Sequence, residues 1–197
     1  MSGMRYDITQ VTVYEWGATV PFADCALRIV PIERRGQRVH SSEIVVEPAA
    51  SLMVDGLDYF GNHVTRVGFR RSHRRLIIKA RARVTVAPPP ALDPDPSPAY
   101  EAIRDATARS LSLAPDDPVQ FLFPSRWVPL APAVTEWAAI SFPPGRSILA
   151  GALDLTRRIR AGFAYDPTAT TVATPLAQAF AARRGVCQDF AHVMIAG

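Results

Sequence analysis

The chemistry that this sequence suggests rests on one cysteine near the end of the chain. Cys187 lies in the run GVCQDFAH (residues 185–192), after a glycine that is expected to end one helix and at the start of the next. The first N–H groups and the dipole of a helix stabilise a thiolate, which is the nucleophilic form of cysteine. The same N–H groups can bind the oxyanion of acyl transfer. Cys187 is therefore a candidate nucleophile, and a buried structural cysteine is the alternative.

Helices are expected to position this cysteine. Apolar residues at helical spacing over residues 147–161 predict an amphipathic helix that Gly162 ends. The next helix is expected to begin with Thr174 as the N-cap and Pro175 as its first residue, and to end at Gly185. Shorter helices are expected over 100–110 and 133–140.

Residues 1–87 are typical of β-strands joined by short turns. The first strand is expected over 6–16, before a turn at Gly17. Further strands are expected over 22–32 and 39–47. These features predict an antiparallel β-sandwich.

The clearest alternation lies in residues 78–86, where even-numbered side chains are apolar and odd-numbered ones are polar or cationic. We expect this strand to pair with residues 63–71 as a hairpin through Ser72 and His73. Residues 58–62 (DYFGN) suit a tight turn, with Tyr59 and Phe60 entering the core.

Proline marks a boundary between two parts of the chain. Residues 87–99 contain six prolines in thirteen positions, which excludes helix and sheet interior. The sequence therefore predicts a β-sandwich domain at 1–87, a linker at 88–98 and a mainly helical part at 99–197. The expected fold class is α+β.

The net charge of +4 is uneven, because residues 1–87 hold 13 arginines and lysines against 8 acidic residues. A cluster of these cationic residues could bind nucleic acid. A solvated hairpin face is favoured, because 21 of the 22 cationic residues are arginines and few aromatic residues lie among them. The cationic cluster comprises Arg66, Arg70, Arg71, Arg74, Arg75, Lys79, Arg81 and Arg83.

The composition also limits location and cofactors. No apolar run reaches the roughly 18 residues of a membrane helix, and the first residues lack a signal-peptide pattern, so a cytoplasmic protein without membrane contact is expected. Cys25 and Cys187 have neither disulfide-framework nor metal-ligand spacing. Cys25 lies in an apolar stretch and is expected in the core. No metal or cofactor is predicted.

The surroundings of the cysteine match a known pattern. Residues 163–176 and 184–192 resemble the bacterial transglutaminase-like cysteine peptidases, and residues 1–87 look like the β-rich region that precedes their core. The resemblance implies papain-like chemistry on peptide or protein amides, with Cys187 as the nucleophile. The acyl-enzyme would pass to water, as in a peptidase or amidase, or to an amine, as in transglutamination.

The resemblance also implies a histidine and an acid on strands downstream of the cysteine helix, and neither can be assigned in this sequence. His192 would lie roughly 140° around the helix from Cys187, which disfavours it as the base. Asp189 is expected to stabilise the helix start. The remaining histidines, His40, His63 and His73, lie in the β-rich part.

The expectation is therefore a truncated papain-like or transglutaminase-like core that is inactive alone. An apolar face with Phe190, Val193 and Met194 would be exposed and would favour self-association. The alternative function is a non-enzymatic β-sandwich interaction module.

Overall fold

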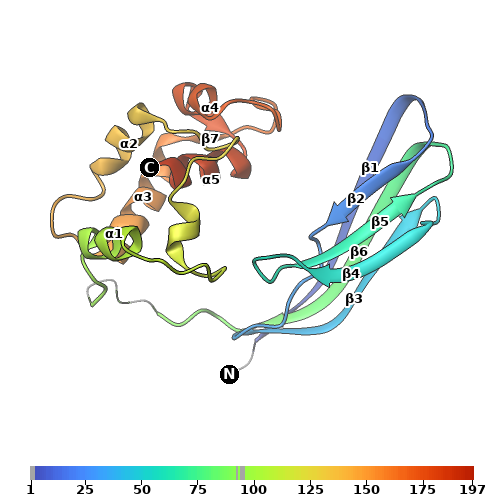
Figure 1. Ribbon diagram of the computed structural model, residues 1–197, viewed down its shortest axis with the longest axis horizontal. Coiled ribbons are helices and arrows are strands. Elements are labelled where there is room, and N and C mark those ends of the chain that lie inside the picture. The colour runs from blue at the N-terminus through green and yellow to red at the C-terminus, as the bar shows by residue number, and fades with distance from the viewer. Residues whose placement is uncertain (1–2, 92, 94–95) are drawn as a thin grey trace. The chain divides into compact units, whose positions relative to one another are not determined.

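The structure, a computed structural model, describes residues 3–91, 93 and 96–197 (Figure 1). It divides into two compact units, Met1–Ala91 and Leu92–Gly197. Residues 92, 94 and 95, within the predicted linker, lie outside the described residues. Each unit has a hydrophobic core of its own.

The first unit contains two three-stranded antiparallel sheets (Figure 1). One has the order β1-β6-β3, formed by β1 (Met4–Val20), β6 (His73–Val86) and β3 (Gln37–Glu47). The other has the order β2-β5-β4, formed by β2 (Ala23–Leu27), β5 (His63–Phe69) and β4 (Leu52–Leu57).

One core joins these two sheets. Val67 and Phe69 of β5 are buried with Leu76 and Ile78 of β6. The alternation predicted for β6 is confirmed at Ile78, Ala80 and Val84, which are all buried. Burial of one face therefore fixes the register of β6, because a one-residue slip would expose that face.

Two expectations for the strands are wrong. β5 and β6 do not pair as a hairpin: β6 pairs with β1 and β3, and β5 with β2 and β4. Each of the two strands turns one row of apolar side chains toward the core. The chain therefore passes from one sheet to the other between them, and the two rows pack on each other. Gly17 does not end the first strand either, because β1 continues to Val20 with a register shift after Glu15.

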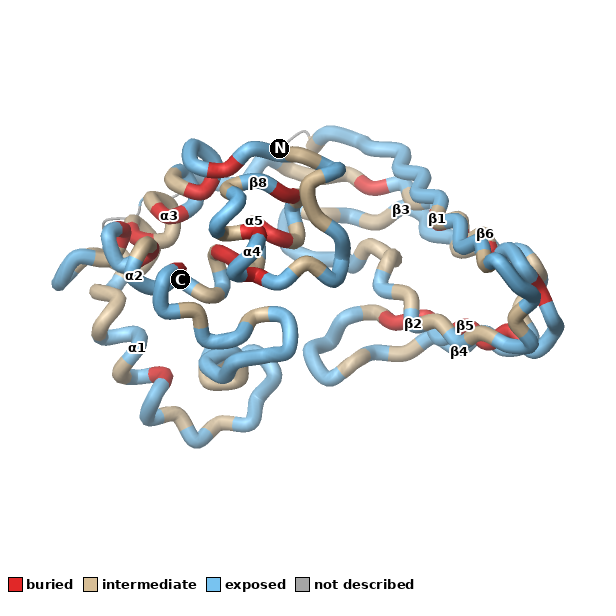
Figure 2. The backbone as a smooth tube through the Cα atoms, turned by 90° about the horizontal axis from the view of Figure 1, so that it is seen from above, coloured by how far each residue is buried: buried red, intermediate tan, exposed pale blue. Residues whose placement is uncertain are grey.

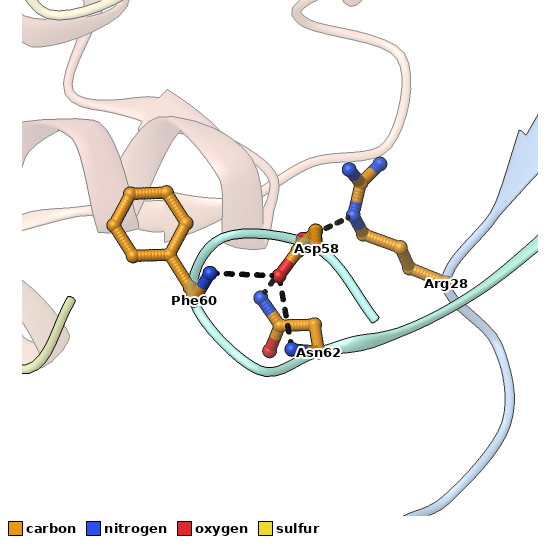
Figure 3. Close-up of polar contacts among 4 residues, drawn as sticks. All are labelled: Arg28, Asp58, Phe60 and Asn62. Atoms are coloured by element: carbon orange, nitrogen blue, oxygen red, sulfur yellow. Dashed lines mark hydrogen bonds and ion pairs between the residues drawn. The ribbon is translucent and has the colours of Figure 1, made fainter. Parts of the chain in front are cut away.

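The turn between β4 and β5 is built around Asp58 (Figure 3). Its carboxylate accepts hydrogen bonds from the backbone N–H groups of Phe60 (3.0 Å) and Asn62 (2.9 Å), and from Arg28 Nε (2.9 Å). Gly61 adopts a φ of 75°, which a tight turn requires. Tyr59 and Phe60 are 56% and 51% exposed, so the prediction that they enter the core is wrong. A turn that folds back on its own carboxylate leaves the two rings at its tip.

The second unit is mainly helical. Its elements are α1 (Tyr100–Ala108), the 3₁₀ helix η1 (Pro118–Phe121), α2 (Pro132–Ala139), α3 (Ile148–Gly162), β7 (Ala164–Tyr165), α4 (Leu176–Ala182), β8 (Arg184–Gly185) and α5 (Cys187–Ala196). Buried positions recur along α2 to α5 (Figure 2). The core cluster comprises Val134, Ala138, Leu155, Ile159, Phe163, Leu176 and Val193.

Both predicted ends of the helix before the cysteine are wrong. α4 begins at Leu176 with Pro175 as its N-cap, because the Thr174 hydroxyl accepts from the Thr171 N–H (2.8 Å) instead of capping the helix. The helix stops at Arg183, which adopts left-handed angles of φ 52° and ψ 32°. Gly185 lies beyond it, in β8.

The expected exposed face of the cysteine helix is also wrong. Val193 is 0% exposed in the core, and Phe190 and Met194 pack against that core partly buried. The helices of this unit bury Val193 and partly cover Phe190 and Met194, so these residues do not form the exposed apolar face that the sequence predicted. Among the residues described, no helix is both long and apolar enough to span a bilayer.

Candidate active site

Cys187 is the first residue of α5, and its side chain is exposed. Val186 precedes it as the N-cap, and the Val186 carbonyl accepts the first helical hydrogen bond, from Phe190 N–H (3.2 Å). The N–H groups at the start of a helix have no partner within the helix. The thiol therefore lies at a helix start, where backbone N–H groups can bind an anion.

Asp189 holds this first turn in place. It is 4% exposed, and its Oδ2 atom accepts from the Val186 N–H (2.8 Å) and from the Thr170 hydroxyl (2.6 Å). A carboxylate in the first turn also suits the helix dipole. The prediction that Asp189 stabilises the helix start is confirmed.

The segment between β7 and α4 is tied to the same turn. Thr170 reaches Asp189, and Gln188 Nε2 donates to the Val172 carbonyl (3.3 Å). The residues directly after Cys187 thus anchor the loop over 166–175 from two positions.

Strands β7 and β8 fix where the loop and α5 begin. They pair in parallel, and the Asp166 N–H donates to the Gly185 carbonyl (2.9 Å). The Thr168 hydroxyl and N–H, both bonded to Asp166 Oδ1, lower the pKa of that carboxyl. A side chain at Gly185 would overlap the Asp189 carboxylate, so this position needs glycine for close approach.

Arg183 turns the chain from α4 into β8. Its left-handed backbone costs a non-glycine residue about 1–2 kcal/mol. Its guanidinium carbon lies 4.0 Å from the ring centre of Phe180, 4.9 Å from that of Phe163 and 5.0 Å from that of Trp137. Cation–π contacts contribute about 0.5–2 kcal/mol each, which is enough to offset the backbone cost. Sequence reasoning missed this residue, because a glycine nearby offered the usual helix stop.

No histidine is brought to the thiol by a hydrogen bond. Across residues 3–91, 93 and 96–197 the Cys187 side chain has no hydrogen-bond partner. In the second unit the sequence has one histidine, His192, which lies on α5 itself. His40, His63 and His73 lie in strands of the first unit. The structure thus adds no base to the nucleophile named from the sequence.

The second cysteine has a different environment. Cys25 lies in β2 and packs partly buried against the core of the first unit. Burial, together with the charge of Asp24, raises the pKa of its thiol. In the part of the chain that the structure describes, no cluster of histidine, cysteine and acidic residues could hold a metal ion.

The cationic cluster does not form one surface. Arg66 lies in β5, whereas Lys79, Arg81 and Arg83 lie in β6 of the other sheet. Several of its arginines pair with carboxylates, which reduces the positive field that nucleic acid would require. These pairs are Arg70–Asp24 (2.7 Å), Arg75–Glu15 (3.1 Å) and Arg83–Asp7 (2.6 Å).

Known proteins resemble this chain along nearly all of its length. Uncharacterized proteins of Mycobacterium bovis and Mycobacterium tuberculosis are 32% identical over 200 residues, which cover 98% of this chain and 60% of each relative. A crystal structure of a proposed cysteine protease from Cytophaga hutchinsonii has the same fold, with a TM-score of 0.73 and 19% identity over 100% of this chain and 63% of that one. The chain thus spans less than two thirds of the proteins that it matches.

A match to a protein family lies in the first unit. Residues 6–85 match the bacterial transglutaminase-like N-terminal region, and this match covers nearly all of the two sheets. The mixed strand and helix content and the matching fold agree with the α+β class. Over this first unit the chain therefore resembles the bacterial transglutaminase-like family.

Proposed function

We propose that Cys187 is the nucleophile of a transglutaminase-like cysteine hydrolase that acts on peptide or protein amides. The observation that carries the proposal is an exposed thiol at the first residue of α5, in a turn fixed by the buried carboxylate of Asp189. The related fold of a proposed cysteine protease supports the same chemistry.

In the proposed reaction the Cys187 thiolate attacks the amide carbonyl carbon. Backbone N–H groups at the start of α5 stabilise the oxyanion of the tetrahedral intermediate. The C–N bond then breaks, the amine leaves with a proton, and a thioester remains on Cys187. Water or a second amine cleaves the thioester and regenerates the thiol. A histidine and an orienting acid are implied by the family resemblance, and we assign neither to a residue of this chain.

Alkylation of single-cysteine variants tests the nucleophile. In Cys25→Ala, we expect iodoacetamide at neutral pH to modify Cys187 about tenfold faster than it modifies Cys25 in Cys187→Ala, because helix-start thiols are activated and buried ones are not. Cysteine in an unstructured peptide is the reference. If Cys187 reacts no faster than the peptide, the proposal is wrong.

A second candidate function is binding of a partner by the first unit acting as a non-enzymatic β-sandwich module. It is favoured by exposed apolar side chains along β4, an edge strand, where Leu52 is 55%, Val54 46% and Leu57 67% exposed. An inert Cys187 in a folded second unit would favour this function over hydrolysis.

A further inference from the structure

The αL turn at Arg183 lies four residues before the proposed nucleophile and has an unusual support. A left-handed backbone normally calls for glycine, yet an arginine occupies it with φ 52°. Its guanidinium lies over three aromatic rings, those of Trp137, Phe163 and Phe180. These rings come from α2, from the residue after α3 and from α4, so the side chain joins three parts of the core.

The rings form a defined receptor for the cation. Their centres lie 5.8–6.1 Å from one another, and Phe163 is 9% exposed. Trp137 is fixed in turn by Arg158, whose guanidinium lies 4.3 Å from the ring centre and donates to the Trp137 carbonyl (2.8 Å). Trp137 is therefore held by a contact outside the turn, whereas Phe180 lies in α4 itself and its carbonyl accepts from the Arg183 N–H (3.3 Å).

The turn sets the path of the chain into the cysteine helix. The Arg183 carbonyl accepts from the Ala164 N–H (2.9 Å), which starts the β7–β8 pairing. Two residues later the Gly185 carbonyl accepts from the Asp166 N–H, and Val186 then caps α5. The backbone conformation at Arg183 therefore helps to set the path of the chain over the four residues up to Cys187.

We propose that Arg183 is a positioning residue for the Cys187 thiol, acting by anchoring its guanidinium among Trp137, Phe163 and Phe180. The proposal rests on the proposed role of Cys187 as the nucleophile. Loss of the anchor leaves an alanine or lysine in a left-handed turn without the full contacts that offset its cost, so the β8 segment and the start of α5 shift. The thiol stays exposed, and its position relative to the loop over 166–175 changes.

The test uses the chain with Cys25→Ala, so that Cys187 is the single thiol. The rate of alkylation is measured against pH for Arg183→Ala, Arg183→Lys and the control Arg184→Ala. Arg184 is the matched neighbour, because among the described residues its guanidinium lies over no aromatic ring, and its Nη1 atom lies 4.0 Å from Asp166 Oδ2. Urea unfolding confirms that each variant is folded under the conditions of the assay.

We expect Arg183→Ala to slow alkylation at neutral pH about tenfold and to change the rate–pH profile, since the interaction of a thiolate with a helix start is of that size. The alkylation rate of Arg183→Lys should lie between the rates of Arg183→Ala and the parent. The rate of Arg184→Ala should stay within about twofold of the parent rate. A merely structural role would lower the unfolding midpoint and leave the profile unchanged. That result in folded Arg183→Ala would overturn the proposal; if this variant does not fold, Arg183→Lys decides in the same way.

Hydrogen exchange separates this proposal from the proposed function. The amides of Ala164 and Asp166 should exchange faster in Arg183→Ala than in Arg184→Ala, because they donate to the carbonyls of Arg183 and Gly185. If parent Cys187 is no more reactive than a peptide cysteine, the proposed function fails, while faster exchange still supports the anchoring by Arg183. Equal exchange in the two variants would overturn the anchoring.

Discussion

The Thr170 hydroxyl donates to the Asp189 carboxylate at 2.6 Å, which connects the loop before α4 to the first turn of the cysteine helix. The same oxygen, Oδ2, accepts the Val186 N–H. One buried atom therefore joins the loop, the N-cap and the residue two positions after the candidate nucleophile. A substitution at any of these three positions is expected to affect the other two.

Removal of the Thr170 hydroxyl should weaken the junction. We expect Thr170→Val to lower the free energy of unfolding by about 1 kcal/mol, because a hydrogen bond to a buried carboxylate is lost. The check is urea unfolding of the parent, Thr170→Val, Asp189→Ala and the double variant. In the Asp189→Ala background the valine should have almost no further effect, and full additivity would contradict the coupling.

Gly185 should not tolerate a side chain. A Cβ atom there would overlap the Asp189 carboxylate, so Gly185→Ala should cost about 1–3 kcal/mol of stability through overpacking. Gly162→Ala is the matched control, since no atom lies within 4 Å of a Cβ at that position. Thermal unfolding of both variants checks this, and equal midpoints would show that the carboxylate can move away.

Alanine substitution should change stability by different amounts at Val193 and at Ile195, although both are apolar residues of α5. Val193 is 0% exposed, so Val193→Ala should destabilise the second unit by about 2 kcal/mol by leaving a cavity. Ile195 is 64% exposed, and Ile195→Ala should change stability by less than about 0.5 kcal/mol. Chemical denaturation of the two variants measures the difference. A larger effect at Ile195 would mean that another surface covers it.

Asp58 should make the first unit sensitive to acid. Hydrogen bonding to Arg28 lowers the pKa of its carboxyl from 3.8 to about 2 (Figure 3). A lowered folded-state pKa stabilises the fold above the unfolded value, so this contribution should be complete above about pH 4 and be lost as the pH falls toward 2. Asp58→Asn should therefore lower the unfolding midpoint at pH 7 and make little difference below pH 2. Asp24→Asn is the control, because Asp24 forms an exposed ion pair with Arg70. This substitution should change the unfolding midpoint little at either pH.

The polypeptide of residues 1–197 should show no turnover of peptide amides or of glutamine donors with amines. The resemblance implies a histidine and an orienting acid that we assign to no residue of this chain, and removal of triad members typically costs several orders of magnitude in rate. Release of amine or ammonia, measured beside Cys187→Ala, checks this. Turnover that Cys187→Ala abolishes would show that one of the four histidines serves as the base.

Several features could be predicted from local sequence. The alternation in 78–86 identified the buried face of β6, because period-two burial is a property of one strand alone. Asp189 could be assigned to the helix start because capping acts within one turn. Residues 1–87 likewise looked like the β-rich region of the bacterial transglutaminase-like proteins, and the match over residues 6–85 agrees with this. The role of Cys187 as the nucleophile, which the GVCQDFAH run indicated, stays a prediction.

Other features were decided only by tertiary structure. Residues 63–69 and 73–86 look like a hairpin in sequence, but burial of both apolar rows on each other places them in different sheets. Val193 could be assigned to the core only once α2, α3 and α4 had surrounded it. Arg183 adopts the left-handed turn normally given to glycine because two rings distant in sequence, Trp137 and Phe163, meet Phe180 of its own helix around the guanidinium. Local preference determined which elements form, and contacts between residues far apart in the chain determined where they end and which surfaces they bury.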